Sequence, residues 1–436
     1  MRTTVFFTSV FNIFHRLHML LTKGEYMADV RPFRGIRPEF ENAEKVACPP
    51  YDVLNTAEAR EIIAGNDASF LRIVRSEADL PEGVDPCSPE VYGRARENLA
   101  SFLKKGLLIQ DENPSFYLYT LVEGVHRQTG LIAGASAEEY IAGSIRKHEL
   151  TRKAKEEDRV RHIDSLNVNS GPVLLTYEAD MEIDALVRKC VEREPVAAFE
   201  DEAGVEHILH KIDDGIVVEE FRNLFSKIDT LYIADGHHRS ASAARVFEKR
   251  RDANSAHTGD EEYCFFLSVI FPDEQLKILA YNRVVKDLKG LTEAAFLEKV
   301  EEAFQVTRSG VKEPTAKGEF SMYLSGKWYT LTPSAPLAGA ILQQLDVSVL
   351  QDRLLQPVLG INDPRKDERI DFVGGSRGTA ELEKLVDEGG FSVAFSMFPT
   401  SIDELTGVAK QGGIMPPKST WFAPKLRSGL VIHSLD

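Results

Sequence analysis

A chain of 436 residues is too long for one ordinary hydrophobic core, so its length predicts two or three structural units. Hydrophobic residues make up 43% and charged residues 28%, which is the balance of a soluble globular protein. The net charge of -16 argues against broad nucleic-acid binding, because such a surface repels phosphate backbones, but it allows a local basic pocket for a small anion. The four cysteines are far apart and form no CxxC pair, which suits a reduced cytosol and argues against disulfides or a cysteine-rich zinc site.

Residues 1–26 carry apolar side chains at helical spacing, but Arg16 lies among them and no small-residue cleavage site follows. A central arginine costs about 2.5–3.5 kcal/mol in a bilayer, so we expect neither a membrane span nor a signal peptide. Met27 then opens MADVRPFRGIRP, which reads as a natural start. We interpret residues 1–26 as an extension outside the fold and residues 27–436 as the functional unit. The alternative is that residues 1–26 form an amphipathic helix that belongs to the structure.

The rest of the chain alternates short apolar runs with helical patterns. Strands are expected at 69–74, 115–121, 172–177, 230–234, 263–271, 276–280, 281–285, 391–398 and 429–434. Helices are expected at 88–105, 181–192, 214–226, 236–251, 291–303, 377–388 and 400–410. Interleaved helices and strands, with some neighbouring strands paired, predict an α/β fold of the mixed α+β kind with a mixed sheet. Polar, glycine-containing stretches at 251–261 and 309–318 suggest subdomains 27–250 and 251–436.

The stretch ACPPYDVL, residues 47–54, joins an apolar strand end to a stiff Pro-Pro turn. Such a turn can direct Tyr51 and Asp52 into a cleft. Cys48 is either a nucleophile or a buried structural cysteine, and the second is the commoner case.

A basic segment, RKHELTRKAKEEDRVR, occupies residues 146–161 of this acidic chain. Seven lysines and arginines against four acids give it a local charge of +3. Most such runs are solvated helices held by salt bridges. Here His148 and Glu149 lie at the start of the run, where an apolar stretch gives way to a loop. We therefore predict an anion-binding role for Lys147, Arg152, Lys155 and Arg159.

The most informative stretch is LYIADGHHRSASAARVF, residues 231–247. An apolar strand stops at Asp235-Gly236, and a helix of small residues follows. Free N–H groups at a helix start favour an anion, and Gly236 lets the backbone approach a ligand closely. Arg239 can clamp a phosphate, while Asp235 can hold magnesium or orient a histidine. The alternative is an aspartate N-cap with incidental histidines; zinc is less favoured because adjacent histidines project in different directions.

A last basic run, KQGGIMPPKSTWFAPKLRSG, covers residues 410–429 without any acid. Lys418, Ser419 and Thr420 offer an ammonium group, two hydroxyls and backbone N–H groups in a proline-stiffened loop, which suits a phosphate. The loop is not a P-loop, because GxxxxGK is absent. Simple structural packing is the alternative.

Several of these stretches resemble an uncharacterised prokaryotic family known as domain of unknown function 1015 (DUF1015). The resemblance is carried by RPFRGIRP, CPPYDVL, ASFLRIVR, IRKHELTRKAKEEDRVRHID, GPVLLTY, LYIADGHHRSASAARV and MPPKSTWFAPKLRSGLVI, which are spread over nearly the whole chain from Met27. More distantly, DGHHRSASAA is similar to a motif of the ParB/serine-kinase (sulfiredoxin-like) superfamily, whose members include an ADP-dependent kinase of free serine and nucleotide-binding partition proteins. The resemblance implies a ParB/serine-kinase-like core around the DGHHR turn, with additional family-specific subdomains.

The resemblance also implies roles for individual residues. Gly236, His237, His238 and Arg239 would surround nucleotide phosphates, with Asp235 near a magnesium ion. Glu149 is the candidate general base toward a serine hydroxyl, and Arg152 or Arg159 would hold the serine carboxylate. Members of the family tend to be encoded beside the first enzymes of phosphorylated serine biosynthesis, which points to serine or phosphoserine.

We therefore predict a cytoplasmic, magnesium-dependent phosphotransferase that moves a phosphoryl group between ADP or ATP and free serine or phosphoserine, in either direction. The predicted catalytic residues are Glu149, Asp235, His237 and His238, with Asp235 as metal ligand. The predicted phosphate ligands are Gly236, Arg239, Ser240, Lys147, Arg152, Lys155, Arg159, Lys418, Ser419, Thr420 and Lys425. Two alternatives remain: a ParB-like nucleotide-binding switch, and a metal-dependent hydrolase that uses His148, His237 and His238. Neither nucleic acid nor membrane is expected as a partner, and the oligomeric state is not predicted.

Overall fold

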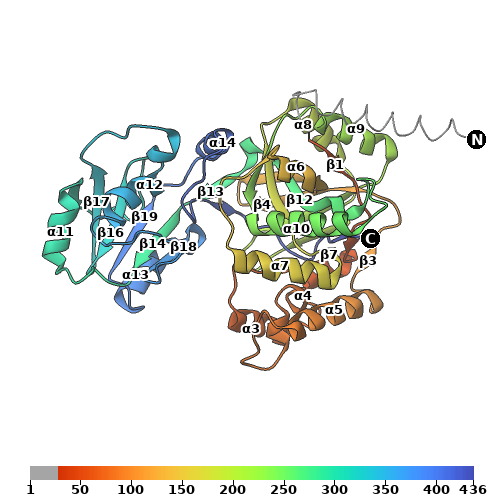
Figure 1. Cartoon of the computed structure of the whole chain (residues 1–436), viewed down its shortest axis with the longest axis horizontal. Coiled ribbons are helices and arrows are strands. Elements are labelled where there is room, and N and C mark those ends of the chain that lie inside the picture. Colours follow the sequence, from red (N-terminus) through yellow and green to blue (C-terminus); the bar gives the residue numbers. More distant parts are fainter. Residues whose placement is uncertain (1–27) are drawn as a thin grey trace, which may run out of the picture.

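The computed structural model describes residues 28–436, so the extension expected at residues 1–26 lies outside the described part. The described chain forms two lobes side by side (Figure 1). The larger lobe contains a nine-stranded mixed sheet in the order β6-β11-β8-β12-β5-β4-β10-β9, with β1 paired to β5. Its strands are β1 Val30–Arg31, β4 Phe116–Glu123, β5 His126–Ser136, β6 Ile145–Arg146, β8 Val173–Tyr177, β9 Ala197–Glu200, β10 Glu206–Ile212, β11 Leu231–Asp235 and β12 Phe265–Pro272.

Both faces of the larger sheet are covered, which explains why β8, β11 and β12 read as continuous apolar runs. One face packs on α6 (Ala137–Ala142), α8 (Met181–Cys190), α9 (Gly215–Phe225) and α10 (His237–Ala253). The opposite face packs on α14 (Ile402–Lys410) and on the C-terminal segment through Leu405, Phe422 and Leu430. The C-terminal segment is therefore part of the larger lobe's core.

A helical layer forms the lower part of the larger lobe in Figure 1. It consists of α3 (Thr56–Gly65), α4 (Leu71–Val74), α5 (Pro89–Lys104) and α7 (Lys153–Leu166), and α7 packs on α10. The short helix α2 (Ala43–Val46) contributes Val46 to the apolar cluster of this layer and also contacts β9. Two short strand pairs complete the lobe: β2 (Ile36–Arg37) with β3 (Ile109–Gln110), and β7 (Val168–Asn169) with β21 (His433–Ser434).

The smaller lobe is an antiparallel six-stranded sheet in the order β15-β17-β16-β19-β14-β18. Its strands are β14 Tyr281–Val285, β15 Phe304–Arg308, β16 Phe320–Leu324, β17 Lys327–Pro333, β18 Ile370–Gly374 and β19 Val393–Met397. Helices α11 (Glu293–Glu301) and α12 (Asp346–Leu350) contribute to one apolar core, and α13 (Gly378–Asp387) to a second.

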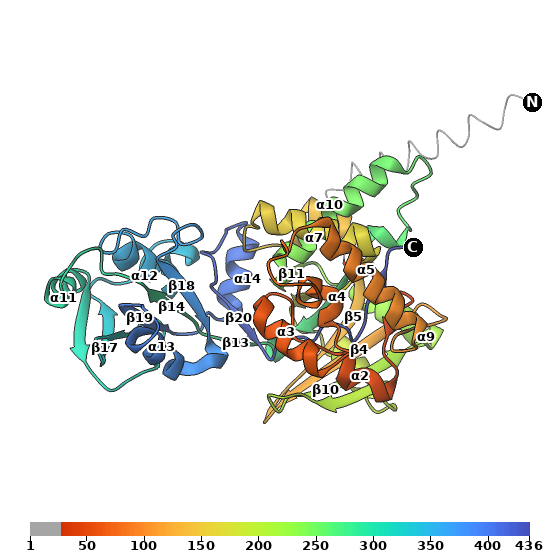
Figure 2. The ribbon, with the colours of Figure 1, turned by 90° about the horizontal axis from the view of Figure 1, so that it is seen from below.

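The connection between the lobes is narrow. The chain leaves the larger lobe through β13 (Lys277–Leu279), which pairs antiparallel with β20 (Trp421–Ala423) of the returning segment. Both strands lie between the two lobes (Figure 2). The smaller lobe is therefore an insertion between these two strands, and the C-terminal basic run crosses back beside the junction.

The mixed α/β fold predicted from the sequence is confirmed, and two local predictions are wrong. Residues 69–74 contain no strand: the one-turn helix α4 covers Leu71–Val74, where the Val74 N–H donates to Phe70 O and the apolar side chains pack within the helical layer. A short apolar run of this kind does not distinguish a buried strand from a buried helix. Of residues 429–434, only His433 and Ser434 pair as a strand, although Ile432 bridges Ile36.

The division at residue 251 stays a prediction. In the structure this position lies inside α10, and β12, which follows it, belongs to the larger sheet. Within residues 28–436, no helix has both the length and the apolar character that a membrane crossing requires.

Candidate functional site

In the described part of the chain, the turn from β11 to α10 leaves backbone donors free at the start of a helix. Gly236 has φ +96°, and a Cβ there would lie 3.3 Å from Val173 Cα, so both conformation and space require glycine. The Gly236 N–H donates to Asp235 Oδ1 at 2.8 Å, and Gly236 O accepts from Arg239 N and Ser240 N. The N–H groups of His237 and His238 have no acceptor among the residues that the structure describes. Two donors and the positive end of the helix dipole therefore remain for a ligand.

A second helix begins at the same place. The backbone N–H of Arg152, the residue before α7, donates to His238 Nε2 at 3.0 Å. This bond ties the amino end of α7 to that of α10, which packs along it. Both helix ends thus direct partial positive charge to one region.

These two helix ends open into a cleft of about 850 Å³, including the open solvent at its mouth. Cations outnumber acids on its walls, because five positive side chains face three carboxyl groups. The cations are Arg152, Lys155, Arg239, Arg365 and Lys418, and the acids are Asp52, Glu149 and Asp235. Tyr51, Leu150, His237, His238 and Pro417 complete the lining side chains. The cleft is thus a local basic site in an acidic protein.

Three of these cations form no close ion pair in the part of the chain that the structure describes. Arg152, Lys155 and Lys418 form no ion pair within residues 28–436; the Arg152 guanidinium donates to a carbonyl, Arg365 O, at 2.9 Å. Burial, and then the charge of Lys418, lower the pKa of the Lys155 ammonium, although Asp52 acts in the opposite direction. A bound anion would relieve this crowding of like charges.

The three carboxyl groups differ in their partners. Asp235 Oδ2 accepts from Lys425 Nζ at 2.8 Å, and although burial opposes this effect, Lys425 holds the pKa of Asp235 well below its usual range. Asp52 faces Arg239 only at 3.7 Å. Glu149 has no hydrogen-bond or ion-pair partner in the described part of the chain, and burial raises its pKa while Lys418 partly offsets this effect.

Burial lowers the pKa of three histidines in or beside the cleft. Burial lowers the pKa of His238 to about 4, with Lys155 contributing, and lowers that of His148 to about 4. His237 packs against His148 edge to face, with ring centroids 4.4 Å apart, and burial also lowers its pKa. Because His238 Nε2 accepts the Arg152 N–H, its proton lies on Nδ1, which makes that nitrogen a neutral donor.

The structure brings most of the predicted site residues together. Glu149, Arg152, Lys155, Asp235, Gly236, His237, His238, Arg239 and Lys418 line the cleft, and Lys425 binds Asp235. Arg159 lies alongside, paired with Asp158 at 2.7 Å and stacked on the Tyr51 ring. Tyr51 and Asp52, which the Pro-Pro turn was expected to direct into a cleft, do line it.

Besides Arg159 and Lys425, four predicted residues do not line the cleft. Lys147 is exposed, with its ammonium group 5.3 Å from the Tyr140 ring centre. Ser240 and Ser419 are buried and donate their hydroxyls to backbone carbonyls, those of His237 and Pro416. Thr420 is half-buried next to Ser419.

Arg239 has structural contacts besides its place in the cleft. It donates to Pro172 O at 2.6 Å, and its guanidinium lies 5.3 Å from the Tyr51 ring centre. Arg239 therefore also ties α10 to the segment before β8. Cys48 is buried, and its backbone pairs with that of Ser428. Burial raises the pKa of its thiol, which fits a buried structural cysteine better than a nucleophile.

Sequence reasoning missed Arg365, which reaches the cleft from the smaller lobe. It lies in the polar stretch NDPRKDER, where nothing separates it from an ordinary solvated charge run. Only the packing of one lobe against the other gives it a place in the site.

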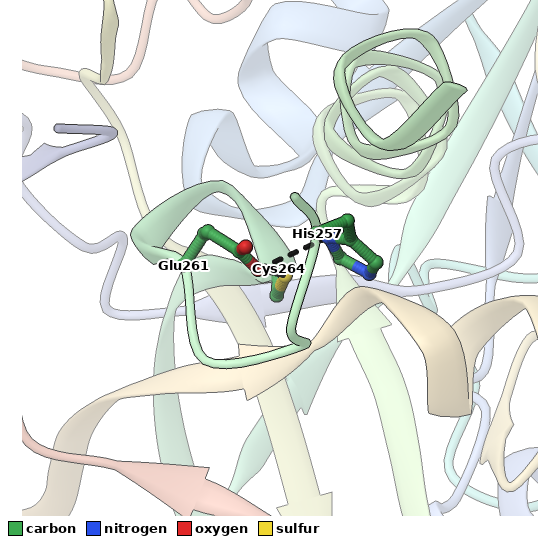
Figure 3. Close-up of side chains that lie close together, drawn as sticks. All are labelled: His257, Glu261 and Cys264. Atoms are coloured by element: carbon green, nitrogen blue, oxygen red, sulfur yellow. Dashed lines mark hydrogen bonds and ion pairs between the residues drawn. The ribbon is translucent and has the colours of Figure 1, made fainter. Parts of the chain in front are cut away.

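Away from the cleft, one group of three side chains converges as metal ligands do: His257, Glu261 and Cys264, drawn in Figure 3. Elsewhere among residues 28–436, including His148, His237 and His238, no such group forms. The Glu261 carboxylate accepts from the N–H groups of Thr258 and Gly259 at 2.7 and 2.9 Å. His257 Nδ1 lies 3.0 Å from Tyr263 OH, and the Cys264 thiol donates to Glu261. The group is thus already satisfied by hydrogen bonds that close the loop.

Comparison with known proteins gives a family and distant structures. The model of a family described as "Protein of unknown function (DUF1015)" matches residues 30–348, well over half of the chain. No curated protein sequence matches it.

Three solved structures are similar at low identity. A conserved hypothetical protein from Pyrococcus furiosus has 16% identity and a TM-score of 0.35, covering 71% of this chain and 97% of that chain. A free serine kinase in complex with AMP has 14% identity and a TM-score of 0.34, covering 72% and 92%. SbnI from Staphylococcus aureus, with a C-terminal truncation, has 13% identity and a TM-score of 0.36, covering 69% and 87%. Because all three TM-scores are below 0.5, we draw nothing about function from them.

Proposed function

The chain belongs to the DUF1015 family, and from the chemistry of its cleft we propose that it is a phosphotransferase acting between a nucleotide and free serine or phosphoserine. One observation carries the proposal. Three cations that form no ion pair within residues 28–436, Arg152, Lys155 and Lys418, line the cleft beside two helix amino ends. A polyanion such as the phosphate chain of ADP or ATP supplies the charge that these groups lack.

The free carboxyl group of Glu149 favours a reaction over binding alone. It faces the same cleft, and burial raises its pKa, as suits a group that takes up and releases a proton. In the forward reaction the serine Oγ attacks the terminal phosphorus of the nucleotide and Glu149 takes the hydroxyl proton. The bond from that phosphorus to its bridging oxygen breaks as the new O–P bond forms. The reverse reaction, from phosphoserine to the nucleotide, yields serine.

The remaining groups position charge rather than react, which is the main task in phosphoryl transfer. The N–H groups of His237 and His238 and the cations of the cleft would bind phosphate oxygens. Arg152, which has no ion pair among the described residues, would also serve the serine carboxylate. Ser240 and Ser419 were predicted as phosphate ligands. This proposal gives their hydroxyls no contact with phosphate, because both already donate to backbone carbonyls.

Magnesium fits the oxygen ligands of the cleft. Asp235 was the predicted ligand, and each of its oxygens already accepts one hydrogen bond, while Asp52 has a looser partner. One or two carboxylates with phosphate oxygens are the usual magnesium environment. When bound, magnesium would neutralise charge on the phosphates; Asp52 and Asp235 would hold it.

A nucleotide-binding switch without an acceptor is the second candidate. It uses the same cations and helix ends, but it gives no role to the unpaired carboxyl group of Glu149. The metal-dependent hydrolase has less support, because His148 and His237 contact each other instead of directing ligand atoms to a common point.

The direct test is incubation of the full chain with phosphoserine, ADP and Mg²⁺, with ATP and serine as the measured products. We expect both products, and we expect Glu149→Gln to abolish their formation while ADP still binds. A protein that binds ADP but forms neither product, with phosphoserine or in reverse from serine and ATP, would support the switch instead.

A further inference from the structure

Arg365 is the one cation of the cleft that comes from the smaller lobe. It precedes β18, while the other charged lining residues belong to the larger lobe or to the segment returning to it. The Arg152 guanidinium donates to Arg365 O at 2.9 Å, so the two lobes touch at this point. The smaller lobe therefore forms part of the wall of the site.

The Arg365 side chain is held by its own loop. Asp363 Oδ1 accepts from Arg365 Nε at 3.0 Å and from its backbone N–H at 3.1 Å. The two terminal guanidinium nitrogens have no acceptor within residues 28–436. An arginine oriented through Nε, with both outer nitrogens free, presents the fork that binds a phosphate in a bidentate manner.

The position of Arg365 relates it to the reacting group. It shares the cleft with Glu149 and Lys418, and its positive charge acts to lower the pKa of Glu149. In the proposed reaction the phosphoryl group passes between the nucleotide and a hydroxyl beside Glu149. A guanidinium at that place would neutralise charge on the terminal phosphate of the nucleotide, which gives or accepts the phosphoryl group.

We propose that Arg365 is a substrate-binding residue, supplied by the smaller lobe, that holds the terminal phosphate of the nucleotide. The chain crosses between the two lobes at the narrow junction of β13 and β20, so a contact between Arg365 and a ligand in the cleft would add a further connection. A ligand bound by Arg365 on one side and by α7 and α10 on the other links the two lobes. The inference rests on the proposed function, because it assigns the nucleotide's terminal phosphate as the ligand.

The test compares Arg365→Ala with Lys366→Ala in calorimetric titrations with ADP and with pyrophosphate at 0.15 M salt. Lys366 is a matched control, since it is the next residue, carries the same charge, has a side chain 85% exposed, and does not line the cleft. We expect Arg365→Ala to weaken binding of both ligands about ten- to a hundredfold. Lys366→Ala should stay within twofold of the wild type. Arg365→Lys keeps the charge but not the fork, and should fall between Arg365→Ala and the wild type.

A second measurement reports ligand binding through heat stability. Pyrophosphate should raise the melting temperature of the wild type, and should raise that of Arg365→Ala clearly less. Wild-type affinity in Arg365→Ala, or equal losses in both variants, would overturn the assignment while leaving the nucleotide site intact. If the wild type binds neither ADP nor pyrophosphate, the proposed function fails, and the assignment of Arg365 fails with it.

Discussion

Lys155→Met should slightly stabilise the ligand-free protein and should weaken the binding of ADP. Lys155 is the third residue of α7, where a cation opposes the helix dipole. In the folded protein, burial and the nearby charges of Lys418 and Arg152 lower its pKa, and Asp52 offsets this only in part. Its ammonium group is therefore slightly unfavourable without a ligand, and removing it should stabilise the protein. Much of the residue still contacts solvent, which screens the charge of the ammonium group, so the gain is no more than about 0.5 kcal/mol.

Binding should change by more, and in the other direction. A charged hydrogen bond to phosphate contributes about 1.5–3 kcal/mol, so Lys155→Met should weaken ADP binding about ten- to a hundredfold. Urea unfolding gives the first quantity and calorimetric titration the second. Lys153→Met is the control, because Lys153 begins the same helix, is exposed and does not line the cleft. Clear destabilisation by Lys155→Met, or ADP binding like that of the control, would refute the reasoning.

Three further predictions concern stability. Arg239→Ala should lower the free energy of unfolding of the ligand-free protein by about 1–3 kcal/mol in urea, because Pro172 O loses its charged donor; a loss below about 0.5 kcal/mol would contradict the structural contact. Burial raises the pKa of Glu139 to about 7, whereas the carboxyl group of the unfolded chain loses its proton above about pH 4.5. The contribution of Glu139 to the free energy of unfolding therefore falls as the pH rises from about 4.5 through 7. Glu139→Gln should therefore gain about 2 kcal/mol more over the wild type at pH 8 than at pH 5, and an equal difference at both pH values would be evidence against it. A metal chelator should leave the melting temperature unchanged, because hydrogen bonds already satisfy His257, Glu261 and Cys264; a fall that Cys264→Ser abolishes would reveal a metal there.

The parts of the site that are local in sequence could be predicted. The turn from β11 into α10 follows from an apolar run, a glycine and a helix of small residues, all within residues 231–247. The joining of this turn with Lys418 and Lys425 could also be proposed, because uncompensated charge in an acidic protein requires a ligand or a distant counter-charge. Lys425 finds that counter-charge in Asp235.

The rest of the site could not be predicted, because tertiary packing determines which side chains point into the cleft. Lys147 and Arg152 belong to one basic run, but the loop between β6 and α7 places only the second in the cleft. The hydroxyls of Ser240 and Ser419 look available in sequence, and they are used by nearby carbonyls. Arg365 reaches the site only because the smaller lobe is inserted between β13 and β20 and packs against Arg152.

The central claim is that α7, α10 and the loop of Lys418 form one site for nucleotide phosphates. Calorimetric titration of ADP into the wild type, Lys418→Ala and Lys153→Met tests it most directly. We predict saturable binding of one ADP per chain in the wild type and in Lys153→Met, and binding weakened about ten- to a hundredfold in Lys418→Ala. Absence of binding to the wild type, or equal affinity in all three proteins, would contradict the claim.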